Sequence, residues 1–223
     1  MYLLLNLVAF VILGLVPAMV LFILAGRWDL WNVWVTVAIF VVSGFFATLG
    51  TYRTSPDLLK ERFKPAGGGR VQWTTARAYL VLTLLQWIIA GLDQRFHWSD
   101  IVPPAGVIAG LVIFAISWGL ATWSTLANPF FSPAVRIQAD RGQRVIQNGP
   151  YAIVRHPGYA GILLAVVVSG VALNSLLAII PALIYLAVTF RVTAIEDQML
   201  RDELAGYTDY AAKVRYRLIP GVW

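Results

Sequence analysis

Two short stretches in the last third of the chain carry the residues best suited to chemistry. The first is the run RHPGYAG at residues 155–161, and the second is the acidic pair at residues 196–197. Pro157 can occupy the first position of a helix, where its missing N–H costs nothing. The free N–H groups of that helix start, beside Arg155 and His156, suit a carboxylate or phosphate ligand. Taken alone, the run is better explained as two interfacial anchors followed by packing glycines.

The two acids of the pair have different neighbours along a helix. Asp197 has Arg201 four residues later, in the order that favours a surface salt bridge, so an exposed ion pair is expected. Glu196 has no charged residue three or four positions away, and it is expected to face a cavity or another polar residue. Arg191 likewise has only apolar helical neighbours. Glu196 is therefore the strongest single candidate for a functional residue.

The composition indicates where such a site would lie. The chain has 223 residues, of which 59% are hydrophobic and 13% charged, whereas soluble domains carry about 25% charged residues. We therefore expect an all-α integral membrane protein with one membrane domain. The sequence has no cysteine, and its two histidines lie far apart, so it offers neither a thiolate nucleophile nor metal-ligand spacing. The net charge is +6, but the basic residues lie between apolar segments, so they do not indicate a nucleic-acid surface.

The uncharged stretches predict about six transmembrane helices, since ~20 residues span a bilayer. They are residues 2–25, 30–52, 78–92 and 101–135, the last ending its helix near Asn128, and a helical hairpin within 158–190. The hairpin turns at residues 174–175, and each arm would have about 15 residues, which barely cross a membrane. A cytoplasmic C-terminal helix is expected to follow it.

The basic residues predict the orientation of these segments. Six segments place fifteen of the seventeen Lys and Arg residues on one side, because only Arg27 and Arg95 fall on the other. The positive-inside rule then predicts a multi-pass protein with both termini in the cytoplasm. The loop 53–77 is expected at the cytoplasmic interface, with a short helix from Ser55 to Phe63 that Ser55 caps. Its glycine triplet at residues 67–69 is expected to be a linker.

Four motifs of the C-terminal region together resemble the isoprenylcysteine carboxyl methyltransferase family. They are NGPYAIVRHPGYAG at 148–161, the acidic pair at 196–197, GYTDY at 206–210 and RLIP at 217–220. The related membrane phospholipid methyltransferases look similar over the same stretch, which covers residues 141–220. The chain then divides into N-terminal transmembrane helices at residues 1–135 and a cofactor-binding catalytic region at residues 136–223.

The resemblance implies an S-adenosylmethionine pocket on the cytoplasmic side, with a lateral opening for a lipid tail. The residues that it assigns to the cofactor are Tyr151, Arg155, His156, Pro157, Tyr159, Gly161, Glu196 and Asp197. The family usually carries two glutamates at the acidic pair, so Asp197 departs from its pattern. Arg191 and Glu196 are the expected catalytic residues, and Arg191, Arg215 and Arg217 are expected to hold an anionic group of the substrate. No metal is expected.

The function expected at this site is carboxyl O-methylation of a lipid-like or prenylated substrate by in-line methyl transfer. A carboxylate nucleophile is ionised at pH 7 and needs no general base. The expected partners are the bilayer and the lipophilic substrate. The alternatives are a phospholipid N-methyltransferase, an NADPH-dependent membrane reductase of the sterol-reductase type, and a non-enzymatic component such as a transporter subunit. A 2′-phosphate would prefer basic neighbours to Glu196, and the apolar segments hold no charge for an ion relay.

Overall fold

The computed structural model describes residues 1–63, 70–133 and 135–223, and within these ranges it contains helices and loops but no strand. Five of the described helices are long and apolar enough to cross a membrane. They are α1 (Tyr2–Ala25), α2 (Trp31–Thr54), α4 (Arg70–Phe96), α5 (Pro104–Ala127) and α7 (Ile179–Glu203). The shorter elements are α3 (Pro56–Glu61), η1 (Ala139–Arg141), η2 (Gly149–Ala152), α6 (Pro157–Ala172) and α8 (Tyr207–Lys213).

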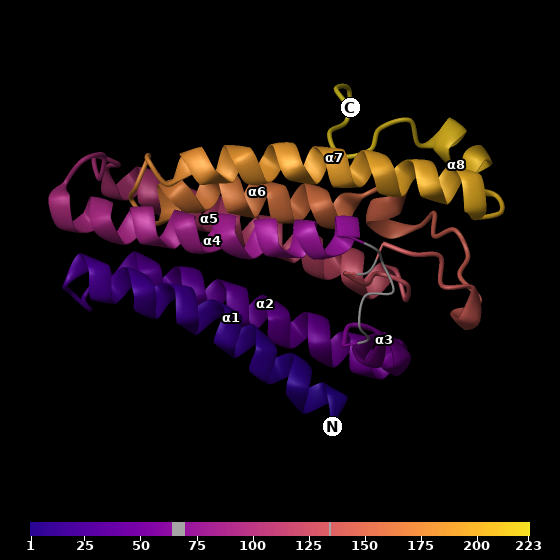
Figure 1. The fold of residues 1–223 in the computed structure, drawn as a ribbon, viewed down its shortest axis with the longest axis horizontal. Coiled ribbons are helices and arrows are strands. Elements are labelled where there is room, and N and C mark those ends of the chain that lie inside the picture. Colours follow the sequence, from indigo (N-terminus) through magenta and orange to yellow (C-terminus); the bar gives the residue numbers. More distant parts are fainter. Residues whose placement is uncertain (64–69, 134) are drawn as a thin grey trace.

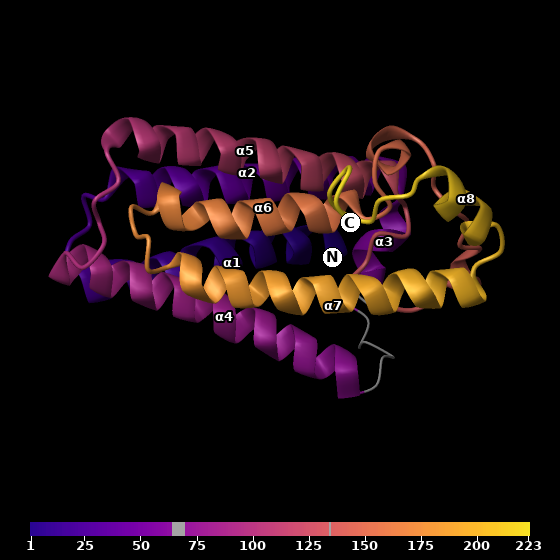
Figure 2. The ribbon, with the colours of Figure 1, turned by 90° about the horizontal axis from the view of Figure 1, so that it is seen from above.

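The long helices run along one common direction, and the short helices α3 and α8 lie with the longer loops at one end of the bundle (Figure 1). Helices α1 and α2 lie together on one side, and α6 lies between α5 and α7 when the bundle is turned (Figure 2). Helix α6 packs most extensively against α5. The short helices α3 and α8 lie at the same end as the start of α6, so the motifs of the C-terminal region meet the loop after α2 there.

The predicted hairpin is confirmed, although its second arm is longer than expected. The first arm, α6, has 16 residues, while α7 has 25 and continues past Arg191 to Glu203. Asn174 adopts a left-handed backbone conformation (φ 54°) in the turn between them. The second arm was predicted to end before Arg191, the first charged residue, but a helix can carry charged residues once it leaves the apolar layer. Because α6 rises only ~24 Å, the count of six spans stays a prediction.

The loop expected at residues 53–77 is shorter than predicted, because its two ends are helical. Helix α2 continues to Thr54 and α4 begins at Arg70, so the predicted short segment 78–92 is part of a helix of 27 residues. The predicted short helix is present as α3, although the Ser55 side chain makes no capping hydrogen bond. Leu58 and Leu59 of this helix are buried within the protein. The glycine linker predicted at residues 67–69 lies outside the described residues.

At the end of the bundle away from α3 and α8, a buried carboxylate joins α4 to the turn between α6 and α7. Asp93 is fully buried. Its Oδ1 accepts from the Ser99 backbone N–H at 2.6 Å, and its Oδ2 accepts from the hydroxyls of Ser99 and, at 2.5 Å, Ser175. Gln94 adds bonds to the carbonyls of Leu173 and Asn174 at 3.0 Å. These contacts satisfy a charge that would otherwise be costly to bury.

The close packing of α5 on α6 depends on Gly161. A Cβ atom at this position would lie 2.7 Å from the Ser117 carbonyl oxygen and 2.9 Å from the Ala121 backbone nitrogen. Gly161→Ala should therefore lower the free energy of unfolding by about 1–3 kcal/mol, as overpacked substitutions do. Gly119→Ala is the matched control on α5, because nothing lies within 4 Å of its Cβ position.

Thermal unfolding of both variants in detergent can be followed through the nine tryptophans of the chain. Gly119→Ala should leave the midpoint nearly unchanged. Equal midpoints for the two variants would show that the α5–α6 contact is looser than described.

Candidate functional site

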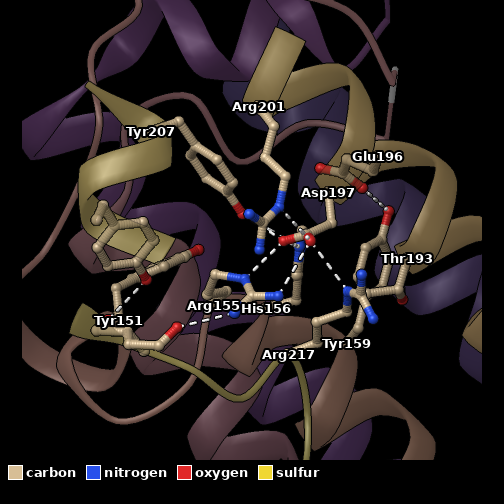
Figure 3. A network of polar contacts seen from close by, with 12 residues as sticks. Tyr151, Arg155, His156, Tyr159, Thr193, Glu196, Asp197, Arg201, Tyr207 and Arg217 are labelled. Atoms are coloured by element: carbon tan, nitrogen blue, oxygen red, sulfur yellow. Dashed lines mark hydrogen bonds and ion pairs between the residues drawn. The ribbon is translucent and has the colours of Figure 1, made fainter. Parts of the chain in front are cut away.

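Asp197 lies at the centre of a buried polar network at the end of the bundle (Figure 3). Its side chain is fully buried, on the inner side of α7. Arg155 binds it with two hydrogen bonds, from Nε to Oδ1 at 2.6 Å and from Nη2 to Oδ2 at 3.0 Å. A guanidinium group that binds a carboxylate at two points fixes both position and orientation. The pair therefore locks the start of α6 to α7.

Three more donors reach the same carboxylate, two from other segments and one from α7 itself. The Tyr207 hydroxyl donates to Oδ1 at 2.9 Å, and the Nε atoms of Arg217 and Arg201 donate to Oδ2 at 3.0 and 3.2 Å. His156 lies 3.4 Å from Oδ1 through its Nε2 atom. One carboxylate thus faces three guanidinium groups, so the network carries excess positive charge.

The backbone of the same region is joined to the C-terminal segment. The N–H groups of Arg155 and His156 donate to the carbonyls of Tyr216 and Arg217 at 2.9 and 2.8 Å. The Nη1 atom of Arg155 donates to the carbonyls of Val214 and Arg215. Every nitrogen of the Arg155 side chain therefore has an acceptor within the protein.

Tyr207 and Tyr151 are buried phenols at the ends of this network. Burial raises the pKa of Tyr207, and the negative charge of Asp197 raises it further. Burial also raises the pKa of Tyr151. The Tyr151 carbonyl accepts a hydrogen bond from the hydroxyl of Tyr210 at 2.7 Å. Both phenols remain protonated at neutral pH, so Tyr207 stays a hydrogen-bond donor to Asp197.

The exposed ion pair predicted for Asp197 is wrong. Arg201 does bind Asp197, as its spacing predicted, but the carboxylate is fully buried. Asp197 shares its buried face of α7 with Thr193 and Leu200. The local helical pattern missed this because the main partner, Arg155, is 42 positions away in sequence.

Glu196 points away from this network and lines a cavity, as its neighbours along the helix predicted (Figure 3). Its Oε2 atom accepts a hydrogen bond from the Tyr159 hydroxyl at 2.8 Å. The ring of Tyr159 lies against that of His156, with 6.0 Å between the centroids. Glu196 is half-buried and keeps acceptor capacity beyond the bond from Tyr159.

The cavity has a volume of about 870 Å³, within the range of small-molecule sites. Its polar end contains five of the residues predicted for the cofactor: Tyr151, Arg155, His156, Tyr159 and Glu196. From Glu196 it continues along α7 to Tyr185, a distance of ~16 Å at the rise of an α-helix.

Aromatic side chains from five helices line the deep end of the cavity. Phe40 contacts Phe10 and Trp118, with ring centroids 5.5 and 4.7 Å apart. Tyr79 stacks on Tyr185 at 4.4 Å, which joins α4 to α7. One cavity thus has a polar end at the network and an apolar interior within the bundle.

Several predicted site residues do not line this cavity. Pro157 takes the first position of α6, as expected, and is buried, while Gly161 contacts α5. The side chains of Arg191 and Arg215 are exposed, and that of Arg217 binds Asp197. The expectation that these three arginines hold the substrate within the site is therefore not met by the geometry.

Sequence reasoning missed Tyr207, Tyr79 and Tyr185. Tyr207 belongs to the GYTDY motif at residues 206–210, but no neighbouring residue in the sequence indicates that its hydroxyl binds Asp197. Tyr79 and Tyr185 lie in apolar runs, where a tyrosine is easily taken for an interfacial anchor. No group of three or more metal-ligating side chains occurs among the residues that the structure describes.

The comparison with family models identifies the region that builds this site. The model of the isoprenylcysteine carboxyl methyltransferase family matches residues 108–201, from the first turns of α5 to Arg201. Over this region, which is less than half of the chain, the sequence is similar to that family. The region includes Arg155, Glu196 and Asp197, whereas Tyr207 and Arg217 follow it. The matched region begins and ends earlier than residues 141–220, the stretch over which the motifs resemble the family. No curated protein matches the chain.

The two acids of the family region should respond differently to loss of charge. Asp197→Asn leaves the buried Arg155 without its counter-ion, so the free energy of unfolding should fall by about 3–5 kcal/mol. Glu196→Gln keeps an amide oxygen that can accept from Tyr159 and removes only the negative charge, so it should cost about 1 kcal/mol. Denaturation midpoints of the two variants beside the parent measure the difference. A larger loss from Glu196→Gln would mean that Asp197 does not hold the fold at this end.

Proposed function

We propose that the chain is an S-adenosylmethionine-dependent membrane methyltransferase that methylates the carboxyl group of a prenylated or other lipid-like substrate. The single observation that carries this proposal is the cavity, which joins the polar residues of the matched family region to an apolar interior. The family name supplies the reaction class. A lipid tail in the apolar part and a small polar cofactor at the polar end together suit this shape.

Glu196 supports the cofactor assignment through its free acceptor capacity. Its carboxylate can accept from the ribose hydroxyls or the ammonium group of adenosylmethionine, beside Tyr159 and His156. Arg155 has a different role from the one expected, because its guanidinium group is fully used by Asp197 and by backbone carbonyls. It positions its neighbour His156, and the surplus charge of the network favours the cofactor's carboxylate over long range.

The chemistry assigns a modest task to the side chains. When bound, adenosylmethionine supplies a methyl group that its sulfonium already activates. Tyr159 and Glu196 orient the ligand, and the aromatic rings of the deep end exclude water from the apolar part. A carboxylate acceptor is ionised at neutral pH, so no residue has to remove a proton. Positioning can then supply much of the rate enhancement.

Adenosylmethionine and adenosylhomocysteine should stabilise the detergent-solubilised protein, while NADPH should not. A ligand at 100 times its dissociation constant adds about 2.7 kcal/mol to the free energy of unfolding. Glu196→Gln should reduce this stabilisation at equal ligand concentration, and Arg191→Gln, at an exposed position, is the matched control. Stabilisation by NADPH alone would replace the methyltransferase proposal with a reductase.

We propose a cytoplasmic position for the polar end of the cavity, with both chain termini in the cytoplasm, because basic residues concentrate in the loops at that end. Reporter fusions at the C-terminus should report the cytoplasm, and fusions within the loops at Arg27 and His97 should report the opposite side. A cytoplasmic signal from the loop at His97 would reverse the orientation.

A further inference from the structure

The cavity lining contains four arginines among the described residues, and three of them are accounted for. Arg155 binds Asp197, and Arg136 binds Glu61 and Asp140. Arg144 has an exposed side chain, which water can solvate. The fourth is Arg62, which directly follows α3.

Arg62 is half-buried, and no carboxylate within the described part of the chain binds it. Burial lowers the pKa of Arg62 to about 10, and no acid among the described residues offsets this effect. The guanidinium group is therefore still protonated at neutral pH. A partly desolvated charge without a counter-ion is unfavourable, and an anion brought into the cavity would relieve that cost.

The position of Arg62 separates it from the residues assigned to the cofactor. It follows α3, which packs against α1 and α2, whereas Tyr159 and Glu196 belong to α6 and α7. Arg62 also precedes the matched family region at residues 108–201. A ligand group that meets Arg62 is thus held from the N-terminal half of the bundle, in the same cavity as Glu196.

We propose that Arg62 binds the carboxylate of the lipid-like substrate and distinguishes it from the methylated product. This inference rests on the proposed function. A guanidinium group pairs with a carboxylate through two parallel hydrogen bonds, a geometry that an ester cannot match. Arg62 takes the role that the sequence had assigned to Arg191, Arg215 and Arg217.

The reaction itself would remove the ion pair. A carboxylate oxygen forms a bond to the methyl carbon while the sulfur–methyl bond breaks and its electron pair stays on sulfur. The negative carboxylate and the positive sulfonium become a neutral ester and a neutral thioether. Arg62 then loses its counter-ion, which weakens the binding of the product and favours its release.

The acid N-acetyl-S-farnesylcysteine and its methyl ester form a suitable probe pair, because they share one tail and differ in charge. Binding of both is measured by fluorescence titration to the full chain and to Arg62→Gln, Arg62→Lys and Arg191→Gln. The parent should prefer the acid. Arg62→Gln should weaken binding of the acid about ten-fold or more and leave that of the ester unchanged. Arg62→Lys should retain part of the preference, and Arg191→Gln should retain all of it.

Adenosylhomocysteine titration of the same variants separates the possible outcomes. An unchanged dissociation constant in Arg62→Gln supports the substrate assignment, whereas a large increase would assign Arg62 to the cofactor's carboxylate and overturn the proposal. A parent protein that does not prefer the acid, or an equal loss for acid and ester, would also overturn it. Failure of the parent to bind adenosylhomocysteine would reject the proposed function instead, and the acid–ester contrast would still test Arg62.

Discussion

The pairing of Asp197 with Arg155 is the interaction on which the polar end of the cavity depends. A buried carboxylate and a buried guanidinium group are costly separately, and each is stable here because the other is present. Tyr207 and Arg217 add donors from α8 and the C-terminal segment. Segments distant in sequence are thereby held in one arrangement. Removing the single carboxylate would take away the side-chain bonds that α7, α8 and the C-terminal segment share, and would leave the bonds from Arg155 and His156 to the C-terminal carbonyls.

The two adjacent acids, Asp197 and Glu196, have different environments on α7. Asp197 accepts from several protein donors and holds the scaffold, while Glu196 turns to the cavity with one donor, Tyr159, among the described residues. The helix makes this difference possible because consecutive side chains diverge by about 100°. A ligand can therefore exchange at Glu196 without disturbing the ion pair behind it. An aspartate suits the inner position, since its short side chain keeps the carboxylate close to α7.

The helices and the cavity-facing position of Glu196 could be predicted because they depend on local composition and spacing. The burial of Asp197 could not, since its partner Arg155 becomes a neighbour only after α6 and α7 pack. The role proposed for Arg62 could not be predicted either, because it depends on the absence of a carboxylate partner among the described residues of the folded chain. The lengths of α4 and α7 were underestimated because charged residues were taken as helix ends. Local sequence patterns thus predicted the helices, whereas the environment of each charged side chain depended on partners that are distant in sequence.

The buried Asp93 at the opposite end has a consequence for how the chain is made. Ser99 follows it closely, but Ser175 is 82 positions later. At ~5–20 residues per second, roughly 4–16 s of synthesis separate the two. During that interval the ribosome has delivered α4 to the membrane while one of its carboxylate's hydroxyl donors does not yet exist. Until then Ser99 supplies the hydroxyl donor to Asp93, and the turn between α6 and α7 adds the second once Ser175 has been made.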